Sequence, residues 1–175
     1  MHIFLTGPLQ VGKSTVIEKT LTLLGQPILG GFRTVSRETC LSQALAEVYL
    51  IPAGRPPIYD RLHLTGIRWG DGLFTAFPEV FDLTGVELLL DIPAGARLLL
   101  MDELGFMERQ DGPFAKAVLS ALDGSLPVLG VVKPQSAPLL DQVRKHPQVQ
   151  VLEVGLDNRS QLPSLVAARL GPLVP

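Results

Sequence analysis

The stretch Phe4–Thr15, FLTGPLQVGKST, decides the fold of this chain. Residues 2–6 are largely apolar and predict a strand, and the spacing of apolar residues over 14–24 predicts a helix. Between them, residues 7–14 match the pattern G-x-x-x-x-G-K-[ST]. In this arrangement, successive backbone N–H groups and the positive end of the helix point at one anion. The stretch therefore predicts a phosphate-binding loop, and the alternative is a glycine-bounded turn without a ligand.

Lys13 and Ser14 supply the reactive side chains of this loop. The Lys13 ammonium is expected to reach the β- and γ-phosphates of a nucleoside triphosphate, and the Ser14 hydroxyl is expected to bind Mg²⁺. Glycines are expected where a side chain would block the turn or the approach of the phosphate. The residues expected to contact the nucleotide are Gly7, Pro8, Gln10, Val11, Gly12, Lys13, Ser14 and Thr15.

A second block, RLLLMDELG at residues 97–105, places two carboxylates after a compact apolar run. Such a run predicts a buried parallel strand, here residues 97–102, whose end lies at the carboxyl edge of the sheet beside the phosphate loop. Asp102 is expected to hold Mg²⁺, and Glu103 is expected to orient or deprotonate an attacking water. The alternative is that both carboxylates simply cap a strand or a helix. Glu108 is expected to orient the following loop or to pair with a basic neighbour.

Strands and helices are predicted to alternate along the rest of the chain. This alternation predicts an α/β fold in three layers, with a mainly parallel central sheet and one domain over residues 1–175. Residues 52–77 are rich in Pro, Gly and Arg, so we expect an irregular loop of the kind that carries function. Further strands are expected at residues 28–33, 45–51, 127–132 and 149–154, and helices at 78–90, 113–122, 137–146 and 158–170.

The composition argues against several kinds of partner. A formal net charge of −2 disfavours nucleic acid as the main partner, because such binding requires a basic face. The single Cys40, expected to be a small packed residue, excludes an intramolecular disulfide, and the three widely spaced histidines make zinc unexpected. No apolar run approaches the roughly 20 residues of a membrane span, and the first residues do not resemble a signal peptide. We therefore expect a cytoplasmic monomer or weak oligomer without nucleic-acid or membrane partners.

Four blocks of the sequence resemble the small P-loop nucleoside-triphosphatase family. This is the family of proteins like cancer-related nucleoside triphosphatase, and it is related to nucleotide kinases. The resemblance implies the P-loop NTPase fold and Mg²⁺-dependent cleavage of the β–γ bond of a nucleoside triphosphate. It departs at Phe106, where the family commonly has Lys, and over residues 35–96, which match poorly. Without that cation, hydrolysis is expected to be slower unless a nearby arginine replaces it. The blocks are FLTGPLQVGKST, GGFRT at residues 30–34, MDELGFME at 101–108 and VLEVGLDNRSQLP at 151–163.

Phosphoryl transfer spreads negative charge over the γ-phosphate oxygens, so a cation in addition to Lys13 and Mg²⁺ is expected. Arg33 is the first choice, because the resemblance implies that its strand ends beside the phosphate loop. A solvated position on the surface is the alternative for every candidate arginine. The other candidates are Arg37, Arg55, Arg61 and Arg68.

Asn158 and Arg159 follow the last predicted strand, where nucleotide-binding sheets commonly have the loop that contacts the base. The alternative is that Asp157 or Asn158 caps the last helix, and the two roles are compatible. Two aromatic residues, Trp69 and Phe74, are expected to pack rather than to stack on a base.

The leading interpretation is a Mg²⁺-dependent nucleoside triphosphatase in which Lys13, Glu103 and Arg33 are catalytic. The first alternative is a nucleoside or nucleotide kinase that uses residues 52–77 as an acceptor site or lid. The second alternative is a non-catalytic nucleotide-binding module. Asp60 and Asp71 are the acids that a kinase acceptor pocket would use.

A dedicated GTP switch is disfavoured. The DELG sequence at residues 102–105 fits a D-x-x-G switch pattern, but the predicted strand at 127–132 leads into KPQS at 133–136. A guanine-reading loop would have Asn-Lys-x-Asp at that place.

Overall fold

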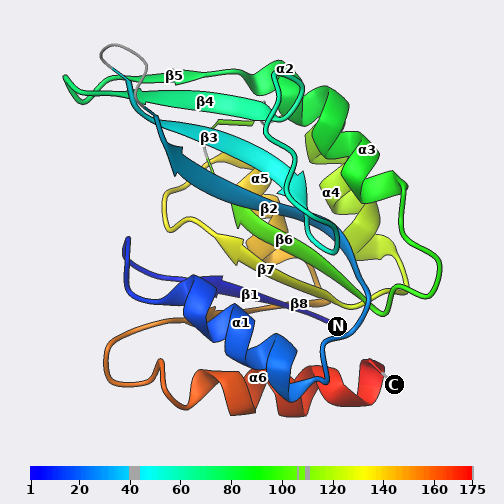
Figure 1. The fold of residues 1–175 in the computed structure, drawn as a ribbon. Helices are drawn as coiled ribbons and strands as arrows, with labels where there is room; N and C mark the ends of the chain where they lie inside the picture. The colour runs from blue at the N-terminus through cyan, green and yellow to red at the C-terminus, as the bar shows by residue number, and fades with distance from the viewer. Residues whose placement is uncertain (40–43, 106, 109–110, 175) are drawn as a thin grey trace.

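The computed structural model describes residues 1–39, 44–105, 107–108 and 111–174. Its strands form one eight-stranded sheet in the order β5-β4-β3-β2-β6-β7-β1-β8 (Figure 1). The strands are β1 (His2–Thr6), β2 (Leu29–Glu38), β3 (Ala44–Pro52), β4 (Leu64–Trp69), β5 (Phe74–Ala76), β6 (Leu98–Leu104), β7 (Val128–Val132) and β8 (Val149–Glu153). The helices are α1 (Lys13–Leu23), α2 (Pro78–Val80), a π-helical turn η1 (Phe81–Gly85), α3 (Val86–Leu90), α4 (Pro113–Asp123), α5 (Pro138–Lys145), α6 (Leu162–Leu170) and a 3₁₀ turn η2 (Gly171–Leu173).

The neighbouring strands β2, β6, β7, β1 and β8 run parallel. Several of them are short apolar runs; β7, for example, reads VLGVV and is buried throughout. Continuous apolar runs are typical of parallel strands covered on both faces. The predicted mainly parallel sheet is confirmed, and the carboxyl ends of these strands lie at one edge.

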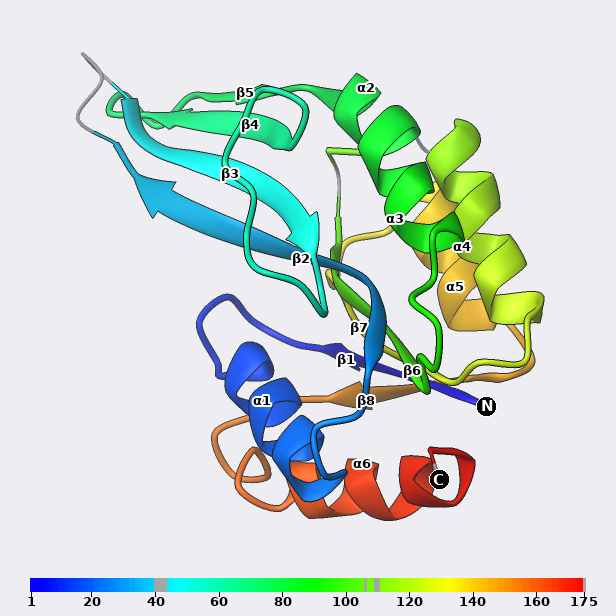
Figure 2. The same cartoon turned by 45° about the vertical axis from the view of Figure 1, so that its right-hand side comes forward.

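Helices cover both faces of the parallel strands and complete three layers. Helices α1 and α6 pack together on one face, whereas α3, α4 and α5 lie on the other (Figures 1 and 2). Side chains of β1 alternate between two apolar clusters: Phe4 joins one with Phe114 of α4, and Ile3 joins the other with Ile17 of α1. The predicted three-layer α/β fold is confirmed.

Residues 52–77 are not one irregular loop, and this prediction is wrong for part of the range. Strands β4 and β5 occupy part of it and extend the sheet antiparallel to β3. Gly66, one of the glycines in this range, is a strand residue of β4. A Cβ atom there would lie 2.4 Å from Cζ of Phe74. The glycine therefore permits close packing of an aromatic ring rather than a turn.

The helices are short, and within the described residues none has the length and apolar character needed to cross a membrane. The predicted start of the last helix at residue 158 is wrong, because α6 starts at Leu162 and residues 156–161 form turns. Pro163 lies in the first turn of α6. Proline is tolerated in the first turn of a helix and disrupts it further inside, so Pro163 requires the later start.

Candidate functional site

The candidate site lies at the edge of the sheet where the parallel strands end (Figure 1). The phosphate loop follows β1, the Asp102–Glu103 pair lies near the end of β6, and Lys133 comes directly after β7. Because β7 lies between β6 and β1, Lys133 is placed between the carboxylates and the phosphate loop. Open parallel sheets bind ligands at this edge. The structure thus brings the two blocks predicted from the sequence together.

The phosphate loop has the backbone conformation that its glycines permit. Gly7 has a φ angle of +136° and Gly12 has one of +109°. A Cβ atom at Gly7 would lie 2.6 Å from the carbonyl oxygen of Val154, so a larger residue would displace the strand-end backbone. Gly12 is the N-cap residue of α1, which begins at Lys13. The loop therefore leads directly into the helix end that favours an anion.

Lys13 is folded back over the phosphate loop. Its ammonium donates hydrogen bonds to the carbonyl oxygens of Gly7, at 2.9 Å, and Pro8, at 2.7 Å. These contacts hold a positive charge at the loop that was predicted to bind phosphate. Charged phosphate oxygens are stronger acceptors than the two carbonyls.

Ser14, Asp102 and Glu103 line one cavity of about 430 Å³. Ser14 is the second residue of α1, whereas the two carboxylates are contributed by β6. The cavity extends from the phosphate loop to the antiparallel strands. Its other lining residues are Leu9, Thr34, Ser36, Val48, Arg68, Phe74, Met107 and Lys133.

Asp102 has a perturbed ionisation. Burial, reinforced by the neighbouring Glu103 carboxylate, raises the pKa of Asp102 to about 6, and the positive charge of Arg33 acts against this rise. Arg33 is the register partner of Asp102 on β2. A carboxyl group in such surroundings is stabilised in its charged form by an added cation.

The donor atoms around Asp102 fit Mg²⁺. Ser14 offers a hydroxyl and Asp102 offers a carboxylate, both on the same cavity. Mg²⁺ prefers oxygen ligands and commonly uses one or two carboxylates, with waters and substrate phosphates completing its shell. In the part of the chain that the structure describes, no three His, Cys, Asp or Glu side chains gather as a metal site. A bound Mg²⁺ would therefore depend on the nucleotide for further ligands.

Glu103 forms an ion pair that the sequence did not predict. Its Oε1 atom lies 3.0 Å from the Nζ atom of Lys133, and the two side chains are about equally shielded, at 24% and 21% exposed. The Glu103 backbone N–H also donates to the Thr34 hydroxyl at 3.4 Å. The sequence signal for Lys133 was its place directly after an apolar strand, the same signal that indicated Asp102.

Glu108 orients the segment after β6, as predicted. Its Oε1 atom accepts a hydrogen bond from the backbone N–H of Gly105 at 2.8 Å. The side chain is buried, and burial raises the pKa of the Glu108 carboxyl.

Arg33 lies beside Asp102, but its guanidinium pairs with Glu18 of α1. Its contact with a γ-phosphate stays a prediction. Among the alternative arginines, Arg68 lines the large cavity, whereas Arg55 is engaged elsewhere, with its Nη2 atom 3.5 Å from Oδ2 of Asp91.

The other two candidate arginines, Arg37 and Arg61, are not among the residues that line the cavity of Ser14 and Asp102. The Arg37 guanidinium lies 5.1 Å from the centre of the Tyr59 ring, and Arg61 is exposed. Phe106, which occupies the family's lysine position, and Cys40 both lie outside the described residues. The predicted effects of Phe106 and the predicted packing of Cys40 stay predictions.

Asn158 closes the turn after β8. Its Oδ1 atom accepts from the backbone N–H of Gly155 at 2.9 Å, and its Nδ2 atom donates to the carbonyl of Glu153 at 2.9 Å. The N-cap residue of α6 is Gln161, so the alternative that Asp157 or Asn158 caps this helix is wrong.

Arg159 lies against the phosphate loop, with its Nη1 atom 3.4 Å from the carbonyl oxygen of Val11. It also lines a second cavity, of about 330 Å³, on the α1 side of the loop. This cavity is a candidate for the nucleoside part of a nucleotide. Its other lining residues are Gly12, Thr15, Val16, Lys19 and Ser160.

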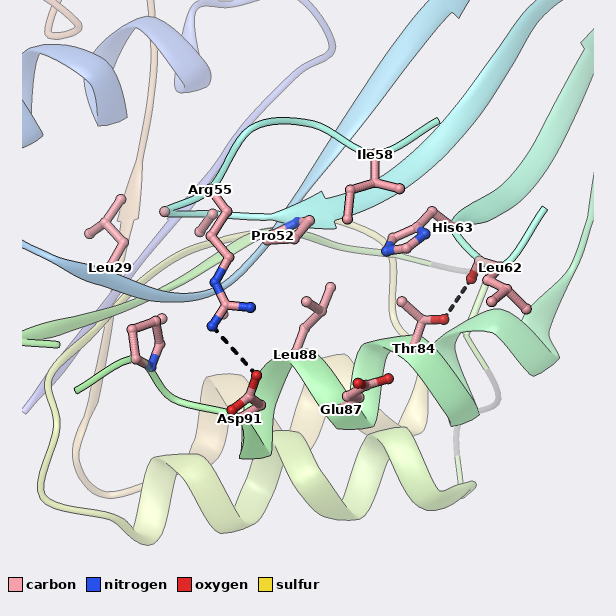
Figure 3. A pocket seen from close by; sticks show the side chains of 15 residues that line it. Leu29, Pro52, Arg55, Ile58, Leu62, His63, Thr84, Glu87, Leu88 and Asp91 are labelled. Atoms are coloured by element: carbon pink, nitrogen blue, oxygen red, sulfur yellow. Dashed lines mark hydrogen bonds and ion pairs between the residues drawn. The ribbon is translucent and has the colours of Figure 1, made fainter. Parts of the chain in front are cut away.

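A third cavity, of about 280 Å³, lies at the start of β2 rather than at its end (Figure 3). Residues 29–31, which line it, pair with residues 98–100, whereas the phosphate edge begins at Asp102. Arg55 and Ile58, from the segment after β3, also line it, and Glu87 and Asp91 lie across from them (Figure 3). This part of the range 52–77 is therefore distant along the strands from the position predicted for a γ-phosphate.

The acids predicted for a kinase acceptor pocket are engaged in turns. Oδ1 of Asp60 accepts from the backbone N–H of Leu62 at 3.0 Å and lies 2.7 Å from Nδ1 of His63. Oδ1 of Asp71 accepts from the backbone N–H of Leu73 at 3.0 Å.

Of the two aromatic residues of the β4–β5 hairpin, Phe74 packs as predicted, and the packing of Trp69 stays a prediction. Nε1 of Trp69 donates to the Thr75 hydroxyl at 2.9 Å. Phe74 packs against the cluster that contains Val48, and it also lines the large cavity.

Comparisons with known proteins agree with this geometry. The sequence model of a family described as NTPase matches residues 2–167. The chain is 29% identical to nucleoside-triphosphatase THEP1 of Thermofilum pendens, over 99% of this chain and 97% of that one. It is 31% identical to the cancer-related nucleoside-triphosphatase homolog of Bos taurus, over 92% of each chain.

Two solved structures have the same fold. The crystal structure of THEP1 from Aquifex aeolicus superposes with a TM-score of 0.73 at 20% identity, covering 97% of this chain and 99% of that one. The solution structure of a human cancer-related nucleoside triphosphatase superposes with a TM-score of 0.66 at 24% identity, covering 96% of each chain.

Proposed function

Because the chain belongs to the NTPase family, we propose that it is a Mg²⁺-dependent nucleoside triphosphatase. It hydrolyses the β–γ bond of ATP, GTP and other nucleoside triphosphates to a diphosphate and phosphate. The observation that carries this proposal is the shared cavity, which Ser14 of the phosphate loop lines together with Asp102 and Glu103 of β6. Hydrolysis requires a phosphate grip, a cation site and a base beside one reacting centre, and these residues supply all three.

Each residue has a definite task in this proposal. The loop N–H groups and Lys13 bind the phosphates, with the ammonium exchanging the carbonyls of Gly7 and Pro8 for phosphate oxygens. Ser14 and Asp102 would hold Mg²⁺, which neutralises charge on the phosphate oxygens when bound. Glu103 accepts a proton from the water whose oxygen attacks the γ-phosphorus. The bond from this phosphorus to the bridging oxygen breaks, and its electron pair leaves with the diphosphate.

The nucleoside is proposed to bind on the other side of the loop. The cavity of about 330 Å³ beside Gly12 and Arg159 has room for a base or a ribose. Arg33 is proposed to stabilise the ionised Asp102 carboxylate beside it and the charge that develops on the γ-phosphoryl oxygens. A single domain, a monomeric or weakly oligomeric state, a cytoplasmic location and the absence of nucleic-acid or membrane partners stay predictions.

The test is phosphate release from ATP, GTP, CTP and UTP with Mg²⁺ and without an added acceptor. Glu103→Gln is expected to lower the turnover number about 100-fold or more, because it removes the general base. Nucleotide affinity should not weaken. Glu79→Gln, an exposed change on α2, is the matched control and should keep the wild-type rate. Steady release that survives Glu103→Gln would contradict the assignment of the base.

A second candidate function is transfer of the γ-phosphoryl group to a nucleoside or nucleotide. The observation that favours it is the size of the large cavity, about 430 Å³, which exceeds the space that one water and a phosphoryl group require. Arg68 and Phe74, both within 52–77, are among the residues that line it. A kinase would show little phosphate release alone and formation of a phosphorylated product when a nucleoside library is added. Rapid release unaffected by every acceptor would exclude it.

A further inference from the structure

Lys133 follows β7 directly, and hydrogen bonds of its backbone fix its place there. Its N–H donates to the carbonyl of Leu104 at 3.0 Å, which continues the β6–β7 pairing past the end of β7. Its own carbonyl accepts a hydrogen bond from the Arg144 guanidinium of α5. The start of the Lys133 side chain is therefore fixed between the two strands that carry the phosphate loop and the carboxylates.

The Lys133 side chain runs along the segment after β6 toward the cavity. A Cβ atom at Gly105 would lie 3.1 Å from Cδ of Lys133 and 3.4 Å from its Cε and Nζ atoms, so the lysine passes close to this glycine. The ammonium then meets Oε1 of Glu103 at 3.0 Å. Lys133 lines the same cavity as Ser14 and Asp102. A lysine that served only to stabilise the fold would not need to reach the cavity that is expected to receive a phosphate.

The charges around the cavity favour an exchange of partners. Asp102 and Glu103 bring two carboxylates to the cavity wall, and Lys133 is the cation that faces Glu103. A bound nucleoside triphosphate adds several negative charges on the phosphate-loop side of Lys133. Phosphate oxygens then compete with Glu103 for the ammonium, which binds them as a mobile point charge on a flexible stem.

We propose that Lys133 is a catalytic residue. Its ammonium group leaves the ion pair with Glu103 and binds the γ-phosphoryl group of the bound nucleotide. This proposal rests on the proposed hydrolysis. The contact stabilises the charge that develops on the γ-phosphoryl oxygens as water attacks. Once the ammonium has left Glu103, the carboxylate is free to accept the proton of that water. The movement of the Lys133 side chain therefore brings a cation to the phosphoryl group and makes Glu103 available as a base. The ion pair in the absence of nucleotide keeps both groups occupied.

The experiment compares wild type, Lys133→Met, Lys133→Arg and the control Lys116→Met, which changes an exposed lysine of α4. The affinities for a non-hydrolysable ATP analogue and for ADP are measured with Mg²⁺, together with the turnover number and the melting temperature. Lys133→Met is expected to lower analogue affinity about tenfold, ADP affinity less than twofold and the turnover number about 100-fold. Lys133→Arg should restore at least part of the turnover, because it keeps the charge.

A second arm tests the exchange without relying on Lys133→Met alone. Glu103→Gln removes the competitor for the ammonium, so it should tighten analogue binding about threefold in the wild-type background. The same change should have no effect in the Lys133→Met background. A purely structural ion pair would instead lower the melting temperature in both single variants and leave the ratio of analogue to ADP affinity unchanged.

The outcomes separate this proposal from the proposed function. An unchanged affinity ratio in Lys133→Met, or unaltered analogue binding in Glu103→Gln, would overturn the role of Lys133. If wild type released no phosphate from any nucleotide, the hydrolase proposal would fail. The affinity ratio would still decide whether Lys133 contacts the γ-phosphoryl group.

Discussion

The sheet has two parts that differ in what they give to the site. The parallel strands β2, β6, β7, β1 and β8 end at one edge. The carboxylates lie in the last residues of β6, and the phosphate loop and Lys133 follow β1 and β7. The antiparallel strands β3, β4 and β5 extend the sheet past β2 and contribute Val48, Arg68 and Phe74 to the cavity wall.

The parallel strands therefore supply the groups that act on the phosphates, and the antiparallel strands help to shape the cavity. Parallel neighbours place all their carboxyl ends together, so short segments from distant parts of the sequence meet at one point. In an antiparallel extension, successive strand ends alternate between the two edges, and only its strand faces border the site. We therefore expect substitutions in the parallel part to abolish turnover and those in the extension to adjust it.

The largest effect is expected at the phosphate loop. Lys13→Ala should weaken nucleoside triphosphate binding about 100-fold or more, because it removes a charge-assisted contact to the phosphates. The melting temperature without nucleotide should change little, since the hydrogen bonds that the ammonium makes within the described part of the chain are to loop carbonyls, at 2.9 Å and 2.7 Å. Equilibrium binding and thermal melting check this, with Lys116→Ala as the exposed control. Unchanged affinity would break the assignment of the parallel edge as the phosphate site.

The parallel part could be predicted because its decisive features are local. Residues 7–14 carry a complete loop pattern, and Asp102 follows an apolar run that is recognisable without knowing its neighbours. Strand β1 and helix α1 lie where the pattern required them, which fixed the loop between them.

Lys133 could not be predicted in the same way. A single lysine after an apolar run also fits an exposed residue at the start of a loop. Its role depends on β7 lying between β6 and β1, and this strand order is a property of the sheet rather than of any segment. The predicted replacement for the missing cation at position 106 was an arginine, whereas the structure offers Lys133 beside Gly105.

The antiparallel extension was misread for a physical reason. Gly66 lies under the Phe74 ring, and Trp69 donates a hydrogen bond to Thr75 across the hairpin. These residues form strands through contacts with each other, so their sequence alone looked like a loop. The apolar spacing predicts a helix from residue 158, but Pro163 is tolerated only in a first helical turn, so α6 begins at Leu162 and Asn158 lies in the preceding turn.

A moderate effect is expected from the ionisation of Asp102, which belongs to the parallel part. Its pKa of about 6 in the folded protein lies above the ordinary value of 3.8, so between these values the folded protein holds a proton that the unfolded chain has lost. The contribution of Asp102 to the free energy of unfolding therefore falls as pH rises from about 4 to about 6. Asp102→Asn should melt higher than wild type at pH 7.5 without metal, with a smaller difference at pH 4.5.

Mg²⁺ sharpens this measurement. Mg²⁺ added together with ADP should raise the melting temperature of wild type at pH 7.5 and have less effect on Asp102→Asn, because the carboxylate is a proposed ligand of the nucleotide-bound cation. Wild type and Asp102→Asn share all other titratable groups, so the difference between their melting temperatures reports the pH dependence of Asp102 alone. A melting difference that is the same at both pH values would show that Asp102 ionises normally.

The smallest effect is expected from the antiparallel extension. Arg68 is exposed on β4 yet lines the cavity with Ser14 and Asp102, so its charge is well screened. Arg68→Ala should raise KM about threefold and change kcat less than twofold, because exposed charge contacts contribute no more than about 1 kcal/mol. Arg55→Ala, at the opposite end of the strands beside Asp91, should change neither constant. If Arg68→Ala instead lowered kcat as severely as Glu103→Gln, the cation for the γ-phosphoryl group would belong to the extension, and phosphate chemistry would not be confined to the parallel part.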